Sequence, residues 1–221
     1  YFSFDRAGVR TETTRPHLFS ITGLLGEDWF VRSYWIVGEG MPGAGWGGWA
    51  NAANTFPSGQ ILSFDGDTVV GYGRENLAGG PVGHRADTYR LFRMKRTSAA
   101  PPVAKQGKSK PPRPAAPLWT DPQSLIVRAM VLGDDRLAVA GPRDLGDKDP
   151  NLLAFTNEPE ARAGFEGKKG VVLRIVSAAD GGRISECELP AMPVFDGLAA
   201  ANGRLYLSTL DGRVLCLAEK K

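Results

Sequence analysis

One short pattern occurs three times in this chain at a fixed interval. It reads ILSFDGDTVVGYG at residues 61–73, AMVLGDDRLAVAG at 129–141 and GLAAANGRLYLST at 197–209. In each copy an apolar run meets a two-residue turn and a second alternating run. The equivalent turn residues lie 68 residues apart and are Asp67, Asp135 and Gly203. A hairpin repeated at a fixed period is typical of radial or stacked repeat folds. We therefore predict an all-β repeat protein whose functional residues lie in its loops.

The period also indicates the size of the repeating unit. Each period holds about four strands and one insertion, and removing the insertion leaves roughly 40–45 residues, the size of one β-propeller blade. We divide the chain into units 1–58, 59–120, 121–190 and 191–221, the last of them incomplete. The prediction is a partial β-propeller with four-stranded antiparallel blades. Because Tyr1 falls in the middle of a pattern, we expect the chain to be the C-terminal portion of a larger propeller.

Two insertions interrupt the strand pattern. Residues 97–117 contain six prolines and almost no bulky apolar side chain, so we predict that they are disordered. Residues 144–169 are the second insertion, and the composition of 158–163 favours a short surface helix. Alternating β-branched and aromatic residues predict further strands at 29–37 and 87–96.

The positive charge of the chain is concentrated in one segment. Eight Lys and Arg residues and no acidic residue lie between Thr88 and Thr120. The rest of the chain is mildly acidic, which argues against a specific nucleic-acid-binding face. We interpret the basic segment as a solvated tether, and contact with an acidic partner, nucleic acid or anionic lipid is the alternative. No run of about 18 apolar residues occurs, so we expect no transmembrane segment.

The cysteines and histidines give no metal pattern. Cys187 and Cys216 each lie in an alternating strand pattern, which predicts small buried thiols. A disulfide between neighbouring strands is an alternative that the sequence leaves open. His17 and His84 each stand alone in predicted loops, without a cysteine or carboxylate at metal-ligand spacing. We therefore expect no metal site.

The region with the strongest ligand-binding signal is 29–50, where four tryptophans fall close to a glycine-rich loop. Aromatic rings beside such a loop stack on sugars, quinones or peptides. The candidate ligand-binding residues are Trp46, Trp49, Arg32, Tyr34 and His17. The competing interpretation is that these tryptophans pack a strand and a long loop onto the core. No pattern typical of a serine-hydrolase elbow, a zinc protease or a phosphate-binding loop occurs, and we identify no catalytic residue.

The last copy of the repeat resembles a known family. Residues 172–217 contain IVSAADGG, RISECEL, GRLYLSTLDG and, continuing to 219, RVLCLAE. These pieces are similar to the repeat of pyrroloquinoline-quinone-type (PQQ-like) β-propellers. That repeat runs from an aspartate turn, ALDA-TG, through a strand ending in Trp, to G-VYVGT-DG-LYALD. Cys187 stands near the place of the family tryptophan.

The resemblance implies the local geometry of the last unit. Its tight turns contain glycines that accept positive φ, and the turn residues are Asp180, Gly181, Asp211 and Gly212. One inter-sheet layer is expected to contain Leu205, Leu207, Val214 and Cys216. Tyr206 is expected on the opposite face.

The resemblance also implies a function. Relatives that bind no quinone act as scaffolds, so we expect a non-enzymatic binding or scaffolding module for a protein or other partner, in the periplasm or at the cell surface. The first alternative is the C-terminal part of a quinoprotein oxidoreductase, which would bind PQQ and calcium. This chain has no adjacent cysteines and no compact Glu/Asn/Asp set of the kind those enzymes use. The second alternative is a carbohydrate-binding propeller that uses Trp46 and Trp49.

Overall fold

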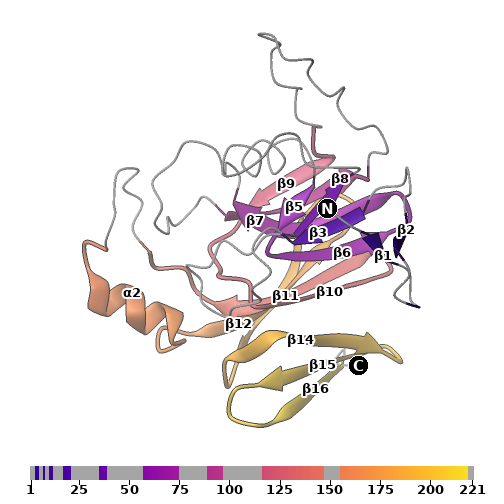
Figure 1. Cartoon of the computed structure of the whole chain (residues 1–221). Helices are drawn as coiled ribbons and strands as arrows, with labels where there is room; N and C mark the ends of the chain where they lie inside the picture. The colour runs from indigo at the N-terminus through magenta and orange to yellow at the C-terminus, as the bar shows by residue number, and fades with distance from the viewer. Residues whose placement is uncertain are drawn as a thin grey trace.

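The computed structural model of the chain consists of antiparallel β-sheets and, within its described part, one helix (Figure 1). It describes residues 3–4, 7, 10–11, 17–20, 35–38, 57–74, 89–96, 116–146 and 155–218. Most of the predicted disordered insertion and most of the strand predicted at 29–37 lie outside these residues. Among the described residues, no helix is long and apolar enough to cross a membrane.

The first two sheets are small. β1 (Ser3–Phe4) pairs with β2 (Arg10–Thr11). A three-stranded sheet follows, formed by β3 (His17–Ser20), β4 (Trp35–Gly38) and β5 (Ser58–Gly59). His17 thus lies in a strand, paired with Gly38, and not in the loop that we expected.

Two four-stranded sheets form the centre of the molecule. The first contains β6 (Ile61–Asp65), β7 (Thr68–Arg74), β8 (Tyr89–Lys95) and β9 (Trp119–Pro122). The second contains β10 (Ala129–Gly133), β11 (Arg136–Pro142), β12 (Val171–Ser177) and β13 (Arg183–Leu189). A three-stranded sheet ends the described chain, with β14 (Pro193–Ala201), β15 (Arg204–Thr209) and β16 (Val214–Ala218). In these three sheets each strand pairs antiparallel with the next strand along the chain, so each sheet is a meander.

The three predicted hairpins are present at the predicted positions. Their last paired residues leave two-residue turns, with Asp65 opposite Thr68, Gly133 opposite Arg136, and Ala201 opposite Arg204. The first residue of each turn has a positive φ, and these residues are Gly66, Asp134 and Asn202. Gly, Asp and Asn are the residues that accept this backbone conformation most readily. The turn chemistry therefore explains why the period was visible in the sequence.

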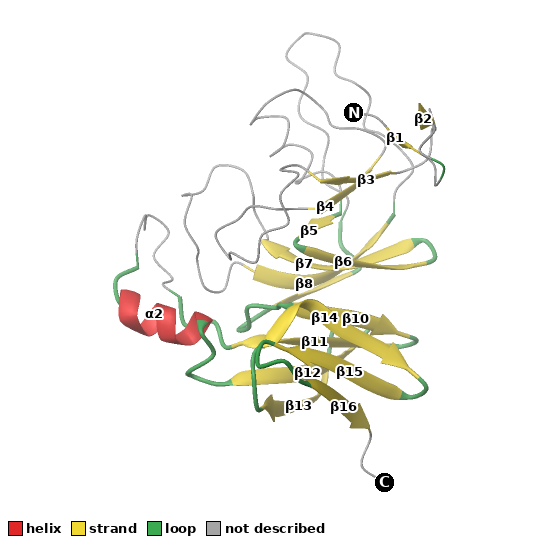
Figure 2. Ribbon diagram, turned by 60° about the horizontal axis from the view of Figure 1, so that its bottom comes forward, coloured by secondary structure: helices red, strands yellow, loops and turns green. Residues whose placement is uncertain are grey.

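The second four-stranded sheet is packed on both faces (Figures 1 and 2). Its side toward β6–β9 forms a core of large side chains, among them Tyr72, Leu91 and Val139. Its side toward β14–β16 contributes Ala138, Ala140 and Leu173 to a second core that includes Leu198 and Leu207. Alternate residues of β10, β11 and β12 thus enter two different cores, as expected for strands buried on both faces.

The first strands of successive sheets lie against each other, since β6 contacts β10 and β10 contacts β14. Two hydrogen bonds also join β14 to Arg128, the residue before β10. The backbone N–H of Asp196 donates to the carbonyl of Arg128 at 2.7 Å, and Nε of Arg128 donates to the carbonyl of Pro193 at 3.0 Å. β14 has an irregular register between Pro193 and Leu198, with Asp196 at a φ of 54°. This irregularity brings the start of β14 onto β10.

Two expectations about side chains were wrong. Neither cysteine forms a disulfide, and both are exposed, since Cys187 lies in the last strand of its sheet and Cys216 lies on the face of β16 turned away from the core cluster. Val214 and Cys216 do not share a layer with Leu205 and Leu207. Directly opposite residues of an antiparallel pair share a face, and Cys216 is opposite Tyr206. The layer instead contains Leu215 and Leu217, which pack on the same core cluster as Leu207.

The predicted surface helix is present as α2 (Glu158–Phe165), part of the second insertion. Asn157 caps it, accepting a hydrogen bond from the backbone N–H of Glu160 at 3.2 Å. Glu158 and Glu160 lie in the first turn and Arg162 in the last, an arrangement that suits the helix dipole. Figure 2 shows α2 at the side of the sheets, beyond the ends of the strands.

Candidate functional site

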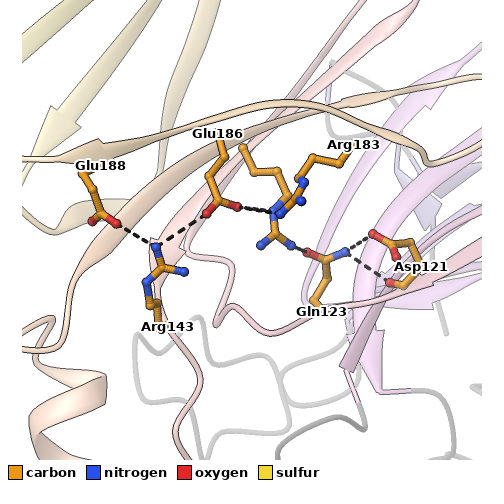
Figure 3. A network of polar contacts seen from close by, with 7 residues as sticks. Asp121, Gln123, Arg143, Arg183, Glu186 and Glu188 are labelled. Atoms are coloured by element: carbon orange, nitrogen blue, oxygen red, sulfur yellow. Dashed lines mark hydrogen bonds and ion pairs between the residues drawn. The ribbon is translucent and has the colours of Figure 1, made fainter.

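A charged side chain is buried between the two four-stranded sheets. Arg174 interrupts the apolar run of β12, on the same face as Val172 and Val176, and only 7% of its surface is exposed. A buried guanidinium must be hydrogen-bonded and paired with negative charge. Arg174 has both kinds of partner. Its Nε donates to Glu186 on β13 at 2.8 Å, and its Nη1 donates to Gln123, which follows β9, at 2.8 Å (Figure 3).

The network continues on both sides of Arg174. Gln123 is 1% exposed, and its amide nitrogen donates to the carboxylate of Asp121 in β9. On the other side, Arg143 donates to Glu188 at 2.7 Å and lies 3.5 Å from Glu186. Figure 3 shows these side chains as one chain of contacts that crosses from the first four-stranded sheet to the second.

Glu186 is the central carboxylate of the network. Burial raises its pKa, but the hydrogen bond and charge of Arg174 and the charges of Arg143 and Arg183 outweigh burial and leave the pKa below its ordinary value. The pKa of Arg143 is raised, mainly by its hydrogen bond to Glu188. Both groups are therefore ionised near neutral pH. The seven residues drawn in Figure 3 include no Ser, Thr, Cys or His. The ion pairs lie within the second sheet, and the hydrogen bond from Arg174 to Gln123 joins that sheet to the first.

A second contact joins the same two sheets at the opposite ends of their strands. Trp119, the first residue of β9, is 8% exposed, and its Nε1 donates to the carbonyl of Ala178 at 2.9 Å. The ring lies against Gly181, at which an added Cβ would stand 2.7 Å from Cε3 of Trp119. Gly181 also has a φ of 78°, which favours glycine. The indole of one sheet is therefore docked on the turn that joins β12 and β13 of the next.

Arg93 reinforces this docking. It is opposite Trp119 in the β8–β9 ladder, and its Nη1 donates to the same Ala178 carbonyl at 2.8 Å. Its Nη2 bonds Asp65 at 2.6 Å, and its Nε bonds Thr68 at 3.0 Å. Trp119 and Arg93 thus connect the first hairpin, the outermost strand and the next sheet. Sequence reasoning missed both roles because neither partner is near them along the chain.

Of the residues predicted to bind a ligand, His17 alone falls within the described structure. Arg32, Tyr34, Trp46 and Trp49 lie outside the described residues, and His17 is in β3. In the described part of the chain, no group of three or more His, Cys, Asp or Glu residues could hold a metal ion.

The predicted turn residues lie in turns. Asp180 accepts a hydrogen bond from the backbone N–H of Gly182 at 2.9 Å, and this bond lowers the pKa of Asp180. Asp211 pairs with Arg213 and accepts from the hydroxyl of Thr209. The bond from Arg213, with that from Thr209, lowers the pKa of Asp211 to about 2.

Comparison with known proteins gives no family. No family model matches the chain, and no curated protein matches it. Among solved structures, the chain is similar to the crystal structure of the computationally designed Ika4 protein, with 8% sequence identity and a TM-score of 0.38. The match covers 71% of this chain and 63% of that one, so the chain spans less than two thirds of the designed protein. A likeness at this level carries no argument about fold or function.

Proposed function

We propose that this chain is a run of PQQ-like β-propeller units and acts as a non-enzymatic binding or scaffolding surface. The observation that carries the proposal is the docking of Trp119 on the turn at 177–182 of the next sheet. The PQQ-like repeat combines an aspartate turn with a strand that ends in a tryptophan. Here a turn of that kind, with Asp180 and Gly181, lies in contact with a tryptophan of the preceding sheet.

The order of the sheets supports the same proposal. Successive meanders are drawn from successive stretches of chain, and their first strands, β6, β10 and β14, are in contact in that order. A propeller requires first strands that meet at the hub and outer strands that diverge. The assignment of units 1–58, 59–120, 121–190 and 191–221 to blades is part of the proposal.

The surface that we assign to binding is the end of the sheets that bears α2. The connection between β11 and β12 is the second insertion, and α2 presents Glu158, Glu160 and Arg162 to solvent. The charged side chains between the sheets are paired with one another, so they serve the scaffold rather than a substrate. By the resemblance, the partner is a protein or another ligand in the periplasm or at the cell surface.

The experiment separates a scaffold from the quinoprotein alternative. Purified protein is mixed with PQQ and calcium, desalted, and examined for the absorbance of retained quinone and for dye-linked oxidation of an alcohol. We expect neither, in the presence or absence of calcium. A known quinoprotein dehydrogenase, stripped and reloaded in parallel, serves as the positive control. Stoichiometric retention of quinone with dye reduction would overturn the proposal in favour of an oxidoreductase.

A further inference from the structure

The last strand of the last sheet has an open edge. β16 pairs with β15 from Arg204 opposite Ala218 to Ser208 opposite Val214, and no described strand lies on its other side. Figure 1 shows β16 at the outside of the molecule, beyond β15 and next to the C-terminus. The two preceding sheets each have a fourth strand at the corresponding place, β9 and β13.

The outer edges of the two preceding sheets carry features that discourage strand pairing, and β16 carries none of them. β9 contains Asp121 and ends at Pro122. β13 contains a register irregularity and three charged side chains. Charges, prolines and irregularities are the usual protection of exposed strands. β16 reads VLCLA, without charge or proline, and its ladder with β15 is regular. An edge without such protection is typical of a strand that pairs with another strand.

The backbone orientation of β16 follows from its hairpin. The N–H of Thr209 donates to the carbonyl of Arg213 at 2.9 Å, which makes these residues a hydrogen-bonded antiparallel pair. Hydrogen-bonded pairs alternate along a ladder, so the N–H and C=O groups of Leu215 and Leu217 point toward β15. Those of Val214, Cys216 and Ala218 point to the open edge. The side chain of Val214 is 67% exposed, and Cys216 is exposed as well.

We propose that β16 pairs with β16 of a second copy of this chain, antiparallel and centred on Cys216. In this register Cys216 is opposite its own copy, Leu215 is opposite Leu217, and Val214 is opposite Ala218. The strand is therefore complementary to itself. The outward-pointing groups form hydrogen-bonded pairs, and the leucines remain on the core face.

The arrangement has twofold symmetry, as most homodimers have. One strand pair buries less surface than the roughly 1,200 Å² of standard interfaces, so we expect a weak, reversible dimer. The inference rests on the edge of β16 alone and does not require the sheets to be propeller blades. A strand from elsewhere in this chain or from another polypeptide is the rival occupant, and either would leave the chain monomeric when pure.

The first test is sedimentation equilibrium from low to high micromolar concentration. We expect the wild type to pass from monomer to dimer. Val214→Pro removes an outward N–H without breaking the β15 ladder and should remain monomeric, whereas Val214→Thr keeps that N–H and should dimerise. Circular dichroism and thermal melting verify that each variant is folded. A wild type that is monomeric throughout, or a Val214→Pro variant that dimerises like its control, would overturn the proposal.

A second test avoids proline. Cys216→Glu and Cys216→Lys each place like charges opposite each other across the twofold axis, so each variant alone should be monomeric. Their equimolar mixture should restore the dimer, because opposite charges then face each other. In a Cys187→Ser background, a short bismaleimide should also join two wild-type Cys216 thiols. No recovery in the mixture together with no cross-link through Cys216 would contradict the register.

Discussion

The docking of Trp119 on Gly181 leads to a quantitative prediction for Gly181→Ala. Two effects oppose the new methyl group. The φ of 78° is unfavourable for alanine, at about 1–2 kcal/mol. The Cβ would also stand 2.7 Å from Cε3 of Trp119, and overpacking of this kind costs about 1–3 kcal/mol. We therefore expect Gly181→Ala to lower the free energy of unfolding by about 2–5 kcal/mol.

The chain contains a matched control for this substitution. Gly212 has a φ of 83°, and an added Cβ would meet nothing within 4 Å. Gly212→Ala therefore reports the backbone term alone, about 1–2 kcal/mol. The difference between the two variants isolates contact with the indole. Removing the indole first should abolish that difference, so Gly181→Ala in a Trp119→Ala background should cost no more than Gly212→Ala.

The assay is urea unfolding followed by far-ultraviolet circular dichroism, since Trp119 itself is varied. Trp119→Ala alone should lower the free energy of unfolding by about 3–5 kcal/mol, because a nearly buried aromatic side chain is lost. Trp119→Phe should cost less, since it keeps an aromatic ring at this position and loses part of the indole's packing and a hydrogen bond worth about 1 kcal/mol. Equal losses for Gly181→Ala and Gly212→Ala would refute the docking, as would strict additivity with Trp119→Ala.

Three further predictions concern ionisable groups. Glu186→Gln should lower the free energy of unfolding at pH 7 by about 1–3 kcal/mol. Because the pKa of Glu186 is lowered in the folded state, the wild type should lose this advantage as the pH falls below about 4.3, which urea unfolding from pH 7 to pH 3 would reveal. Asp211 should titrate near its pKa of about 2 in carboxyl NMR, and Arg213→Gln should move that pKa upward, whereas an unmoved midpoint would contradict the pairing. Cys187 and Cys216 should both react with a thiol reagent in the folded protein. The reaction rate at Cys187 should continue to increase at pH values above the ordinary pKa of a thiol, because burial and then the charges of Glu186 and Glu188 raise the pKa of Cys187. An unreactive Cys187 would contradict its exposure.

Local features of this fold were predictable because they depend on neighbouring residues. The hairpin turns at Gly66, Asp134 and Asn202 need residues that accept positive φ, and such residues are visible in any sequence. Helix α2 was predictable from its composition. The face of the sheet on which Cys216 lies was not predictable. The connection from Thr209 to Arg213 determines which residue lies opposite Tyr206, and a shift of one residue moves every later side chain to the other face.

Contacts between sheets were beyond sequence reasoning for a different reason. Arg174 and Gln123 are 51 residues apart, and Trp119 and Ala178 are 59 apart. An arginine in an apolar strand is a signal that a partner exists, since a buried charge requires one. The sequence offers many acidic and amide residues as that partner. The β12–β13 ladder places Glu186 opposite Arg174, and only the stacking of the sheets selects Gln123.

The position of Arg143 explains how one sheet carries a long insertion at little cost. Arg143 is the residue at which the chain leaves β11, and its backbone N–H donates to the carbonyl of Gly170, where the chain returns to β12, at 3.3 Å. Its side chain bonds Glu188 of β13. The ends of the insertion are therefore fixed to the sheet whatever lies between them. Because the entropic cost of closing a loop grows only slowly with its length, an insertion whose two ends are fixed in this way tolerates large changes in length and sequence. Variation in sequence and length is thus cheapest at the end of the sheets that bears α2, and this is the physical reason for assigning partner binding to that end.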